Sequence, residues 1–437
     1  MNISVIGLGK LGLCTAVCFA VKGHRVIGFD ENRYIMDELN AKHCPIDETG
    51  LDQLLDKAWQ NLIITADIEN AVLNSEISLV IVPTPSQANG RFTNEYVKDA
   101  LRALSPALEK KEDFHVVGIV STVMPGSCEM LFKPLLEKLT GKECGRDFGL
   151  VYNPEFIALG SVIRDFLNPD MVLVGASDGC SAKMAKKLYL TTCNNNPKVE
   201  IMSLINAEIT KLSLNCFVTM KISFANELAS ICEKVPDTQI DVITNALGMD
   251  TRIGSKYLKA GLGFGGPCFP RDNQAFQVFA RESGVELRLG PQVVTINNSV
   301  VDRLFDIISK KTNPCDKIAL LGLSYKPGTH IIEESQSIML TKRLVDSGFV
   351  VSVHDPKAIP AAKDVLGDNV SYFDDPYECI KDAAGIILLT NWQVYKDLDW
   401  KLAGTLVKNR ALLLDSWRAL KDINLDGFRY VGFGVGT

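Results

Sequence analysis

The sequence predicts an α/β protein in which two doubly wound domains are joined by a long central helix and a helical middle domain. Short apolar runs alternate with helical patterns near both ends of the chain, as expected for parallel strands that are covered by helices. A glycine-rich turn follows the first apolar run. Residues 201–233 contain neither proline nor glycine and follow a helical pattern. From these features we expect domains at 1–198, 199–300 and 301–437.

The composition argues against several classes of partner. Of the 437 residues, 46% are hydrophobic and 22% are charged, and the net charge is -6. This charge, without a dense Lys/Arg cluster, argues against a nucleic-acid partner. No segment has the ~18 uninterrupted apolar residues of a membrane span, and we expect no signal peptide. The twelve cysteines show no metal-ligand or disulfide spacing, so we expect no metal site and reduced thiols in a cytoplasmic protein.

The N-terminal segment has the pattern of a Rossmann-like dinucleotide-binding unit. A β-rich run at 2–6 precedes a glycine turn and an apolar helical pattern, and a second β-rich run at 24–29 follows. The first glycine of such a turn permits the bend, the second lets pyrophosphate approach the backbone, and the third lets the helix pack on the strand. The helix N-terminus then faces the phosphates. The turn consists of Gly7, Leu8, Gly9, Lys10, Leu11 and Gly12.

The acid at the end of the second β-rich run indicates which cofactor binds. Asp30 can accept hydrogen bonds from the adenosine ribose hydroxyls and would repel a 2′-phosphate. We therefore expect NAD rather than NADP. The alternative is a glycine-rich turn without a ligand, but the order strand, turn, helix, strand and acid argues against it.

Two further apolar runs end in polar turns. Residues 78–82 lead into Pro83 and Thr84, and residues 115–120 lead into Ser121 and Thr122. Because parallel strands end at the ligand crevice, these turns are placed to reach a cofactor or a substrate. A surface turn uses the same residue types, so this pattern alone leaves both interpretations open.

The long helix at 201–233 carries a polar stripe. Glu208, Lys211 and Asn215 follow the spacing i, i+3 and i+7 and therefore share one face. A solvated stripe is one interpretation. The apolar residues around it favour a buried helix, in which such a face requires partners.

The C-terminal segment repeats the pattern of the first domain. Apolar runs at 317–323, 350–356, 384–390 and 411–415 are separated by helical stretches, which predicts a second open α/β layer. Two nucleotide-type domains suggest two nucleotide-containing ligands.

With these motifs in order, the chain resembles the nucleotide-sugar dehydrogenases, the family of UDP-glucose 6-dehydrogenase and GDP-mannose 6-dehydrogenase. The resemblance covers essentially the whole chain. It implies NAD-dependent oxidation of the C6 alcohol of a nucleotide sugar to a carboxylate in two steps. The motifs that carry it are residues 7–12 with Asp30, 82–85, 121–126, 153–156, 168–170, 211–215, 252–254, the loop GLGFGGPCFPRD at 261–272, and 322–327.

The resemblance implies a covalent mechanism. An aldehyde must be captured by a nucleophile before a second hydride can leave, and a thiolate does so through a thiohemiacetal and then a thioester. The nucleophile falls on Cys268, in a loop whose glycines we expect to give ligands access to the backbone. The other catalytic residues implied are Lys211 and Asn215 at the oxyanion, Asp272 in proton handling, Glu155 as general base and Thr122 at the hydrolytic water.

The resemblance also implies binding residues and a homodimer or larger assembly. Arg252 comes from the neighbouring subunit in this family. Cofactor contacts are expected at Gly7, Leu8, Gly9, Lys10, Leu11, Gly12, Asp30, Pro83, Thr84, Ser121, Thr122, Glu155 and Arg271. Contacts with the nucleotide-sugar substrate are expected at Phe156, Ile157, Ala158, Leu159, Lys211, Asn215, Ile222, Arg252, Tyr257, Leu258, Lys259, Gly261, Phe264, Gly265, Lys326 and Arg418.

Four positions depart from the family pattern. Leu159 stands where a second glutamate is usual, Ile35 replaces a basic residue, Pro267 replaces the serine before the cysteine, and Glu333 stands where an arginine helps to hold the cofactor. We expect these changes to alter substrate preference and to weaken NAD binding. We expect activity to be retained because the catalytic set is present.

Alternatives remain open at this level. UDP-glucose is the first choice of substrate, because the Asn-Pro-Glu-Phe segment resembles the glucose and mannose branches. GDP-mannose and UDP-N-acetylhexosamines are the alternatives. A two-electron hydroxyacid-type dehydrogenase would leave Cys268 without a role and release one NADH per substrate. A non-catalytic sugar-nucleotide-binding protein would release none.

Overall fold

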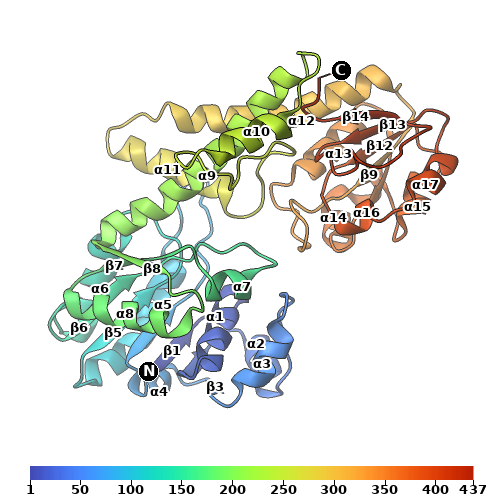
Figure 1. Cartoon of the computed structure of the whole chain (residues 1–437). Coiled ribbons are helices and arrows are strands. Elements are labelled where there is room, and N and C mark those ends of the chain that lie inside the picture. Colours follow the sequence, from blue (N-terminus) through green and yellow to red (C-terminus); the bar gives the residue numbers. More distant parts are fainter. Residues whose placement is uncertain (437) are drawn as a thin grey trace. The chain divides into compact units, whose positions relative to one another are not determined.

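The computed structural model describes residues 1–436 and divides into two compact units, Met1–Ser213 and Leu214–Thr437 (Figure 1). Each unit contains one sheet that is covered by helices, which confirms the α/β fold class. The finer division into three domains stays a prediction. The described part of the chain contains no helix whose length and hydropathy would let it cross a membrane.

The first unit contains an eight-stranded sheet with the order β3-β2-β1-β4-β5-β6-β7-β8. This order contains the 3-2-1-4-5-6 arrangement of a doubly wound dinucleotide-binding sheet. All neighbouring strands are parallel except β6 and β7. The strands are β1 (Asn2–Ile6), β2 (Arg25–Phe29), β3 (Leu62–Ile64), β4 (Ile77–Val80), β5 (His115–Ile119), β6 (Phe148–Tyr152), β7 (Met171–Ala176) and β8 (Lys198–Met202).

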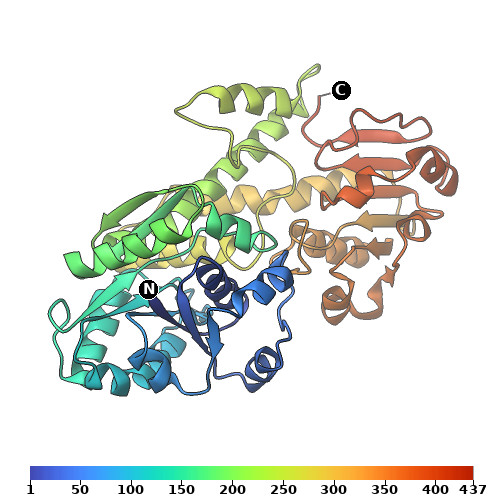
Figure 2. The same cartoon turned by 60° about the horizontal axis from the view of Figure 1, so that its bottom comes forward.

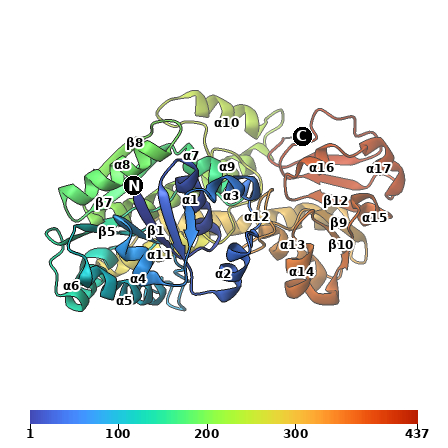
Figure 3. The same ribbon diagram turned by 90° about the horizontal axis from the view of Figure 1, so that it is seen from below.

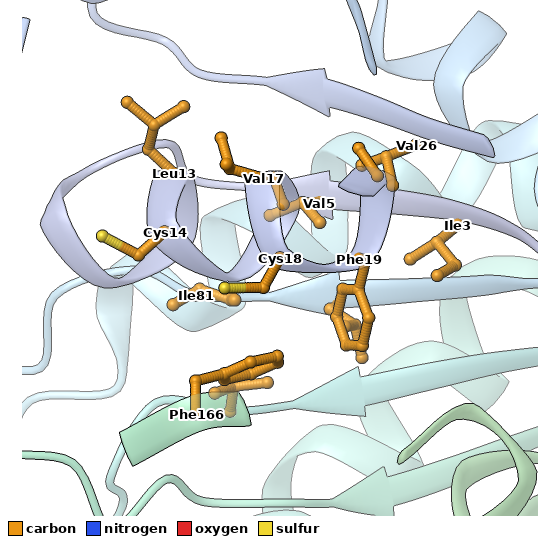
Figure 4. Packing of buried hydrophobic residues seen from close by; sticks show 14 of the residues in the cluster. Ile3, Val5, Leu13, Cys14, Val17, Cys18, Phe19, Val26, Ile81 and Phe166 are labelled. Atoms are coloured by element: carbon orange, nitrogen blue, oxygen red, sulfur yellow. The ribbon is translucent and has the colours of Figure 1, made fainter. Parts of the chain in front are cut away.

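Helices cover both faces of this sheet (Figure 3). One core cluster packs α1, α3, α7 and α8 against the strands, and another packs α4, α5, η1 and α6. Figure 4 shows apolar side chains of α1, including Val17 and Phe19, beside strand residues and Phe166 of α7. The helices are α1 (Lys10–Val21), α2 (Arg33–Asn40), α3 (Leu51–Ala58), α4 (Ile68–Leu73), α5 (Glu95–Lys110), η1 (Cys128–Phe132), α6 (Lys133–Thr140), α7 (Val162–Leu167) and α8 (Gly179–Thr192).

The long helix expected at 201–233 is α9, Leu204–Cys232. Its continuity follows from the absence of proline and glycine, which interrupt helices most strongly. The helix runs across the boundary between the two units.

The described part of the second unit contains the end of α9, three further helices and then a six-stranded sheet with the order β11-β10-β9-β12-β13-β14 (Figure 2). Its strand pairs are parallel. The helices before the sheet are α10 (Ile240–Met249), α11 (Phe269–Glu282) and α12 (Leu289–Lys311). The strands are β9 (Lys317–Leu321), β10 (Val350–His354), β11 (Ser371–Tyr372), β12 (Gly385–Leu388), β13 (Leu412–Asp415) and β14 (Arg429–Gly432).

The core of this second sheet also has two sides. Helices α12, α13 (Gln336–Asp346) and α14 (Ile359–Leu366) contribute to one cluster. Helices α15 (Pro376–Ile380), α16 (Gln393–Lys396) and α17 (Trp400–Leu406) contribute to the other. A short 3-10 helix, η2 (Gly367–Asn369), follows α14.

Candidate active site

The glycine turn after β1 has the geometry of a phosphate-binding turn. Gly7 has a φ of 97°, and a Cβ atom there would collide with the carbonyl of Ile81. A Cβ atom at Gly12 would collide with the carbonyl of Gly7, because the helix packs directly on the turn. At Gly9, the N-cap of α1, a Cβ atom would meet nothing within 4 Å. The turn therefore provides open space at the end of a helix that favours an anion.

Asp30 lies beside this turn. Its Oδ2 accepts a hydrogen bond from the backbone N–H of Leu8 at 2.6 Å, and its Oδ1 accepts one from Asn32 at 2.8 Å. Each oxygen retains a further lone pair that can accept from a ribose hydroxyl. The turn and the acid together fit the adenosine pyrophosphate half of NAD.

The second unit repeats this turn but uses its acid differently. Gly322 follows β9 with a φ of 105°. Its N–H donates to the carbonyl of His354 at 2.8 Å, and the N–H of Gly7 donates to the carbonyl of Phe29 at the same distance. Asp355 stands where Asp30 stands in the first unit. Its Oδ2 accepts from Leu323 N, Ser324 N, Ser324 Oγ and Trp392 Nε1 at 2.8–3.2 Å. Protein donors therefore surround Asp355 Oδ2, which corresponds to the Asp30 oxygen that accepts from Leu8.

The turns after β4 and β5 are bonded to one another. The hydroxyl of Thr84 donates to the carbonyl of Thr122 at 2.7 Å. Ser121 Oγ accepts from Val82 N at 3.0 Å and donates to Val82 O at 2.6 Å. The structure thus brings Thr84, Ser121 and Thr122 together, with a structural role for the first two hydroxyls. Pro83, between them, is exposed.

Glu155 and Lys211 meet in the first unit. Glu155 follows β6, and its carbonyl oxygen accepts a hydrogen bond from Lys211 Nζ of α9 at 2.7 Å. The same ammonium lies 4.7 Å from the ring centroid of Phe156. The ammonium is therefore held at the start of the predicted substrate segment.

The carboxylate of Glu155 has a partner that the sequence did not indicate. Tyr189 of α8 donates its hydroxyl to Glu155 Oε1 at 2.8 Å. Burial raises the pKa of Glu155 to about 7, although the Tyr189 hydrogen bond and the charge of Lys211 both lower it. A carboxyl group with this pKa can serve as a base near neutral pH. The only sequence signal at Tyr189 was a tyrosine in a helical run.

The predicted substrate segment after Glu155 is fixed by a glutamate that was also missed. Glu48 accepts hydrogen bonds from Gly160 N at 3.0 Å and Val162 N at 3.1 Å, and lies 3.8 Å from Lys10 Nζ. Leu159 packs against the apolar core of the first unit. The leucine that replaces the family's usual glutamate therefore contributes to packing. Its neighbours Ile157 and Ala158 are half-buried.

The polar stripe of α9 obtains the partners that burial requires. Glu208 is fully buried and accepts from Gly126 N at 2.6 Å and Cys128 N at 2.8 Å. Burial raises the pKa of this carboxyl group, while these hydrogen bonds oppose the rise. Glu208 thus anchors the loop after Thr122 to the helix that carries Lys211.

Cys268 begins helix α11 in the second unit. It is exposed and occupies the N-cap position, where the helix end favours an anion such as a thiolate. Asp272 lies in the first turn of the same helix and is buried. Its Oδ2 accepts a hydrogen bond from Asn215 Nδ2 at 2.6 Å. Its Oδ1 is buried, lies 3.6 Å from Arg271 Nε and accepts no hydrogen bond within residues 1–436.

The glycines before Cys268 have a packing function that the sequence did not indicate. Cβ atoms at Gly261, Gly265 and Gly266 would collide with the Trp417 ring, the Glu334 carbonyl and the Tyr325 ring. These glycines are therefore required where the loop packs on its own unit, and ligand access to the loop backbone stays a prediction.

Side-chain amides fix the backbone of the same loop. Gly261 N donates to Asn226 Oδ1 at 3.0 Å, Gly263 N to Gln336 Oε1 at 2.7 Å and Phe264 N to Asn297 Oδ1 at 2.7 Å. The loop that leads to Cys268 is therefore held by packing and by three amide acceptors.

The other predicted substrate residues of the second unit lie in varied environments. Arg418 is buried, and its guanidinium donates two hydrogen bonds to the Asp241 carboxylate at 2.8 and 2.9 Å and others to backbone carbonyls. Arg252 is exposed and pairs with Asp250 at 2.6 Å. Lys326 Nζ lies 5.7 Å from the ring centroid of Tyr325. The remaining positions are Leu258, which is buried, Ile222, which is half-buried, and Tyr257 and Lys259, which are exposed.

Comparison with protein families decides the identity of this arrangement. Residues 1–193 match the NAD binding domain of the UDP-glucose/GDP-mannose dehydrogenase family. Residues 205–299 match its central domain, and residues 319–422 match its UDP binding domain. The chain belongs to the UDP-glucose/GDP-mannose dehydrogenase family. It is an NAD-dependent oxidoreductase.

Individual relatives agree with this family. UDP-glucose 6-dehydrogenase AglM of Haloferax volcanii is 34% identical over 403 residues, covering 91% of this chain and 93% of the relative. The UDP-glucose 6-dehydrogenase of Rickettsia bellii is 32% identical, with 99% of each chain covered. A solved UDP-glucose dehydrogenase from Pyrobaculum islandicum has a TM-score of 0.89 and 32% identity, covering 99% of this chain and 97% of that one.

Proposed function

We propose that this dehydrogenase oxidises the C6 alcohol of UDP-glucose to the carboxylate of UDP-glucuronate. The observation that carries the proposal is the exposed thiol of Cys268 at the N-terminus of α11, beside the buried pair Asp272 and Asn215. A two-electron dehydrogenase has no need of such a nucleophile. The similarity to UDP-glucose 6-dehydrogenases over the full chain supports this choice of sugar.

The glycine turn and Asp30 would hold NAD+, which would supply the hydride acceptor for each of the two oxidations. The first oxidation converts the C6 alcohol to an aldehyde. The Cys268 thiolate then adds to the aldehyde carbon and forms a thiohemiacetal, whose oxygen can supply the electron pair that expels the remaining hydrogen as hydride. Loss of that hydride and of the hydroxyl proton gives a thioester. Water cleaves the C–S bond, releasing the carboxylate and restoring the thiol.

We assign the remaining catalytic roles to five side chains. Lys211 supplies positive charge to the developing oxyanion, and Asn215 supplies a neutral donor. Glu155 takes a proton from the hydrolytic water, since its pKa of about 7 leaves it a base at neutral pH. Asp272 takes part in proton transfer, and Thr122 anchors the water.

We propose that the predicted set of residues holds the substrate. We assign NAD binding to residues 1–198, assembly to 199–300 and UDP binding to 301–437. Gly261, Phe264 and Gly265 would contribute backbone groups. Lys326 would contact the diphosphate or the sugar. The extensive bonds of Arg418 to Asp241 and the backbone suggest that it acts chiefly by shaping this region.

We propose a homodimer or larger homo-oligomer that forms around α9. Phe217, Phe224 and Ile231 are 59%, 46% and 56% exposed and follow one another at seven-residue steps, which places them on one face. A second copy of the chain covering this face would bury these three apolar side chains and would bring Arg252 to a neighbouring site. Light scattering on the double variant Phe217→Asp/Phe224→Asp should show a smaller particle than the wild type.

We place the protein in the cytoplasm, because its twelve cysteines are free thiols.

The function is tested by a panel of nucleotide sugars assayed with NAD+. We expect two NADH per UDP-glucose, and UDP-glucuronate as the product. Equal or faster turnover of GDP-mannose or a UDP-N-acetylhexosamine would reassign the substrate. One NADH per sugar would indicate a two-electron dehydrogenase, and binding without NADH release would indicate a non-catalytic protein.

A further inference from the structure

We propose that Tyr189 is a positioning residue for Glu155, orienting its carboxylate and setting the pH range in which it acts as a base. The inference rests on the proposed function of Glu155 in hydrolysis of the Cys268 thioester. It concerns a residue outside the motifs that carry the family resemblance. The contact that carries it is the 2.8 Å hydrogen bond from Tyr189 Oη to Glu155 Oε1.

The direction of this hydrogen bond is fixed. Tyr189 is 2% exposed, and burial together with the charge of Glu155 holds the pKa of its hydroxyl well above 10. The phenol therefore keeps its proton at any working pH and donates it to the carboxylate. A hydrogen bond to the charged form favours ionisation, so Tyr189 opposes the effect of burial on Glu155.

The Tyr189 ring is held by two other aromatic rings. It lies 6.0 Å from Phe19 at an interplanar angle of 75° and 6.0 Å from Phe166 at 48°. Phe19 and Phe166 are themselves 5.3 Å apart at 84°, and Figure 4 shows both in the packed core. Phe19 belongs to the cofactor helix α1, and Phe166 to the helix after the substrate segment. This packing fixes the hydroxyl, so a carboxylate bound to it is preorganised.

The other titratable groups near the carboxylate do not replace Tyr189. Lys211 uses its ammonium on the Glu155 carbonyl and adds a favourable charge. Cys18 of α1 and Cys193 after α8 interact with Glu155, but burial and this carboxylate raise the pKa of each thiol to about 12. Both thiols are therefore neutral at working pH. Without the Tyr189 hydroxyl, burial would raise the pKa of Glu155 further.

The experiment compares pH profiles of UDP-glucuronate formation for the wild type and Tyr189→Phe. The rate limb that requires ionised Glu155 should move to higher pH by about 1–2 units, because hydrogen bonds to charged groups are worth roughly 1.5–3 kcal/mol. Below that limb, intact-mass spectrometry should detect more thioester on Cys268 in the variant. Incorporation of 3-fluorotyrosine at position 189 keeps the ring and makes the hydroxyl more acidic, so it should move the limb to lower pH.

Two controls separate positioning from stability. Tyr395 is fully buried and donates its hydroxyl to the His354 carbonyl at 2.9 Å, so Tyr395→Phe removes a comparable bond in the other unit. Its pH profile should match the wild type. In a Glu155→Gln background, Tyr189→Phe should not shift the profile.

The outcomes distinguish the inference from the function on which it rests. A wild type that releases two NADH per sugar while both position-189 variants retain its pH profile overturns the Tyr189 inference alone. The same holds if Tyr395→Phe shifts the limb as much as Tyr189→Phe. A wild type that releases fewer than two NADH overturns the proposed function.

Discussion

The carboxylate of Asp272 accepts a 2.6 Å hydrogen bond from the side-chain amide of Asn215, which joins the helix of the proposed nucleophile to the long helix α9. Asp272 is 1% exposed. A carboxylate this deeply buried depends on its donors, since an unpaired buried charge is strongly unfavourable. Asn215 therefore has a structural function beside its proposed one at the oxyanion.

Replacement of Asn215 tests this pairing. Asn215→Leu should lower the free energy of unfolding by about 1–3 kcal/mol, because it leaves Asp272 Oδ2 without its donor. The double variant Asn215→Leu/Asp272→Leu should lose less free energy of unfolding than the two single variants lose together. Urea denaturation measures both effects. Additive losses would show that the two side chains do not depend on one another.

The two related acids Asp30 and Asp355 make a matched pair for testing cofactor binding. Asp30→Asn should raise the KM for NAD about tenfold and reduce discrimination against NADP, since it removes a charge and a ribose acceptor. Asp355→Asn should lower stability without changing the KM for NAD, because protein donors fill that carboxylate. Steady-state kinetics with both cofactors would contradict this account if the two variants had the same NAD preference.

The raised pKa of Glu155 makes stability depend on pH. With a pKa near 7 in the folded protein and 4.5 as the ordinary value, the folded state binds the proton more tightly. Its contribution is fully present below pH 4.5 and is lost as pH rises through 7. Glu155→Gln should therefore stabilise the protein, relative to the wild type, more at about pH 8 than at about pH 5. Urea midpoints at the two pH values check this, and an unchanged difference would argue against a raised pKa.

Glu208 should matter for stability. Glu208→Ala leaves the buried N–H groups of Gly126 and Cys128 without their acceptor and should lower the free energy of unfolding by about 2–4 kcal/mol. Glu129→Ala is the matched control, because it breaks an exposed ion pair with Lys133 and should change stability by about 0–1 kcal/mol. Similar losses in chemical denaturation would contradict this difference.

Local patterns predicted much of the fold. The strands beginning at Asn2, His115 and Lys317 and the helix from Leu204 to Cys232 lie where apolar runs and helical spacing placed them. Strand β3 was not predicted because Leu62–Ile64 is too short to show a pattern. The antiparallel pairing of β7 with β6 was missed because it depends on tertiary contacts.

The candidate site was predictable only where its chemistry is local. The glycine turn and Asp30 lie close in sequence and have a fixed spacing. Tyr189 meets Glu155 from another helix, and Glu48 meets the substrate segment from a distant loop, so no spacing indicated either contact. The packing function of the loop glycines was not predicted, because the atoms that a Cβ would meet, such as the Trp417 ring, come from remote segments.

The most direct test of the central claim is the product formed by Cys268→Ser from UDP-glucose and NAD+, followed by mass spectrometry and by counting NADH. The wild type should form UDP-glucuronate with two NADH per sugar. The variant should form no carboxylate, because serine cannot replace the thiolate as nucleophile and leaving group. Normal steady-state formation of UDP-glucuronate by Cys268→Ser would contradict the proposed mechanism.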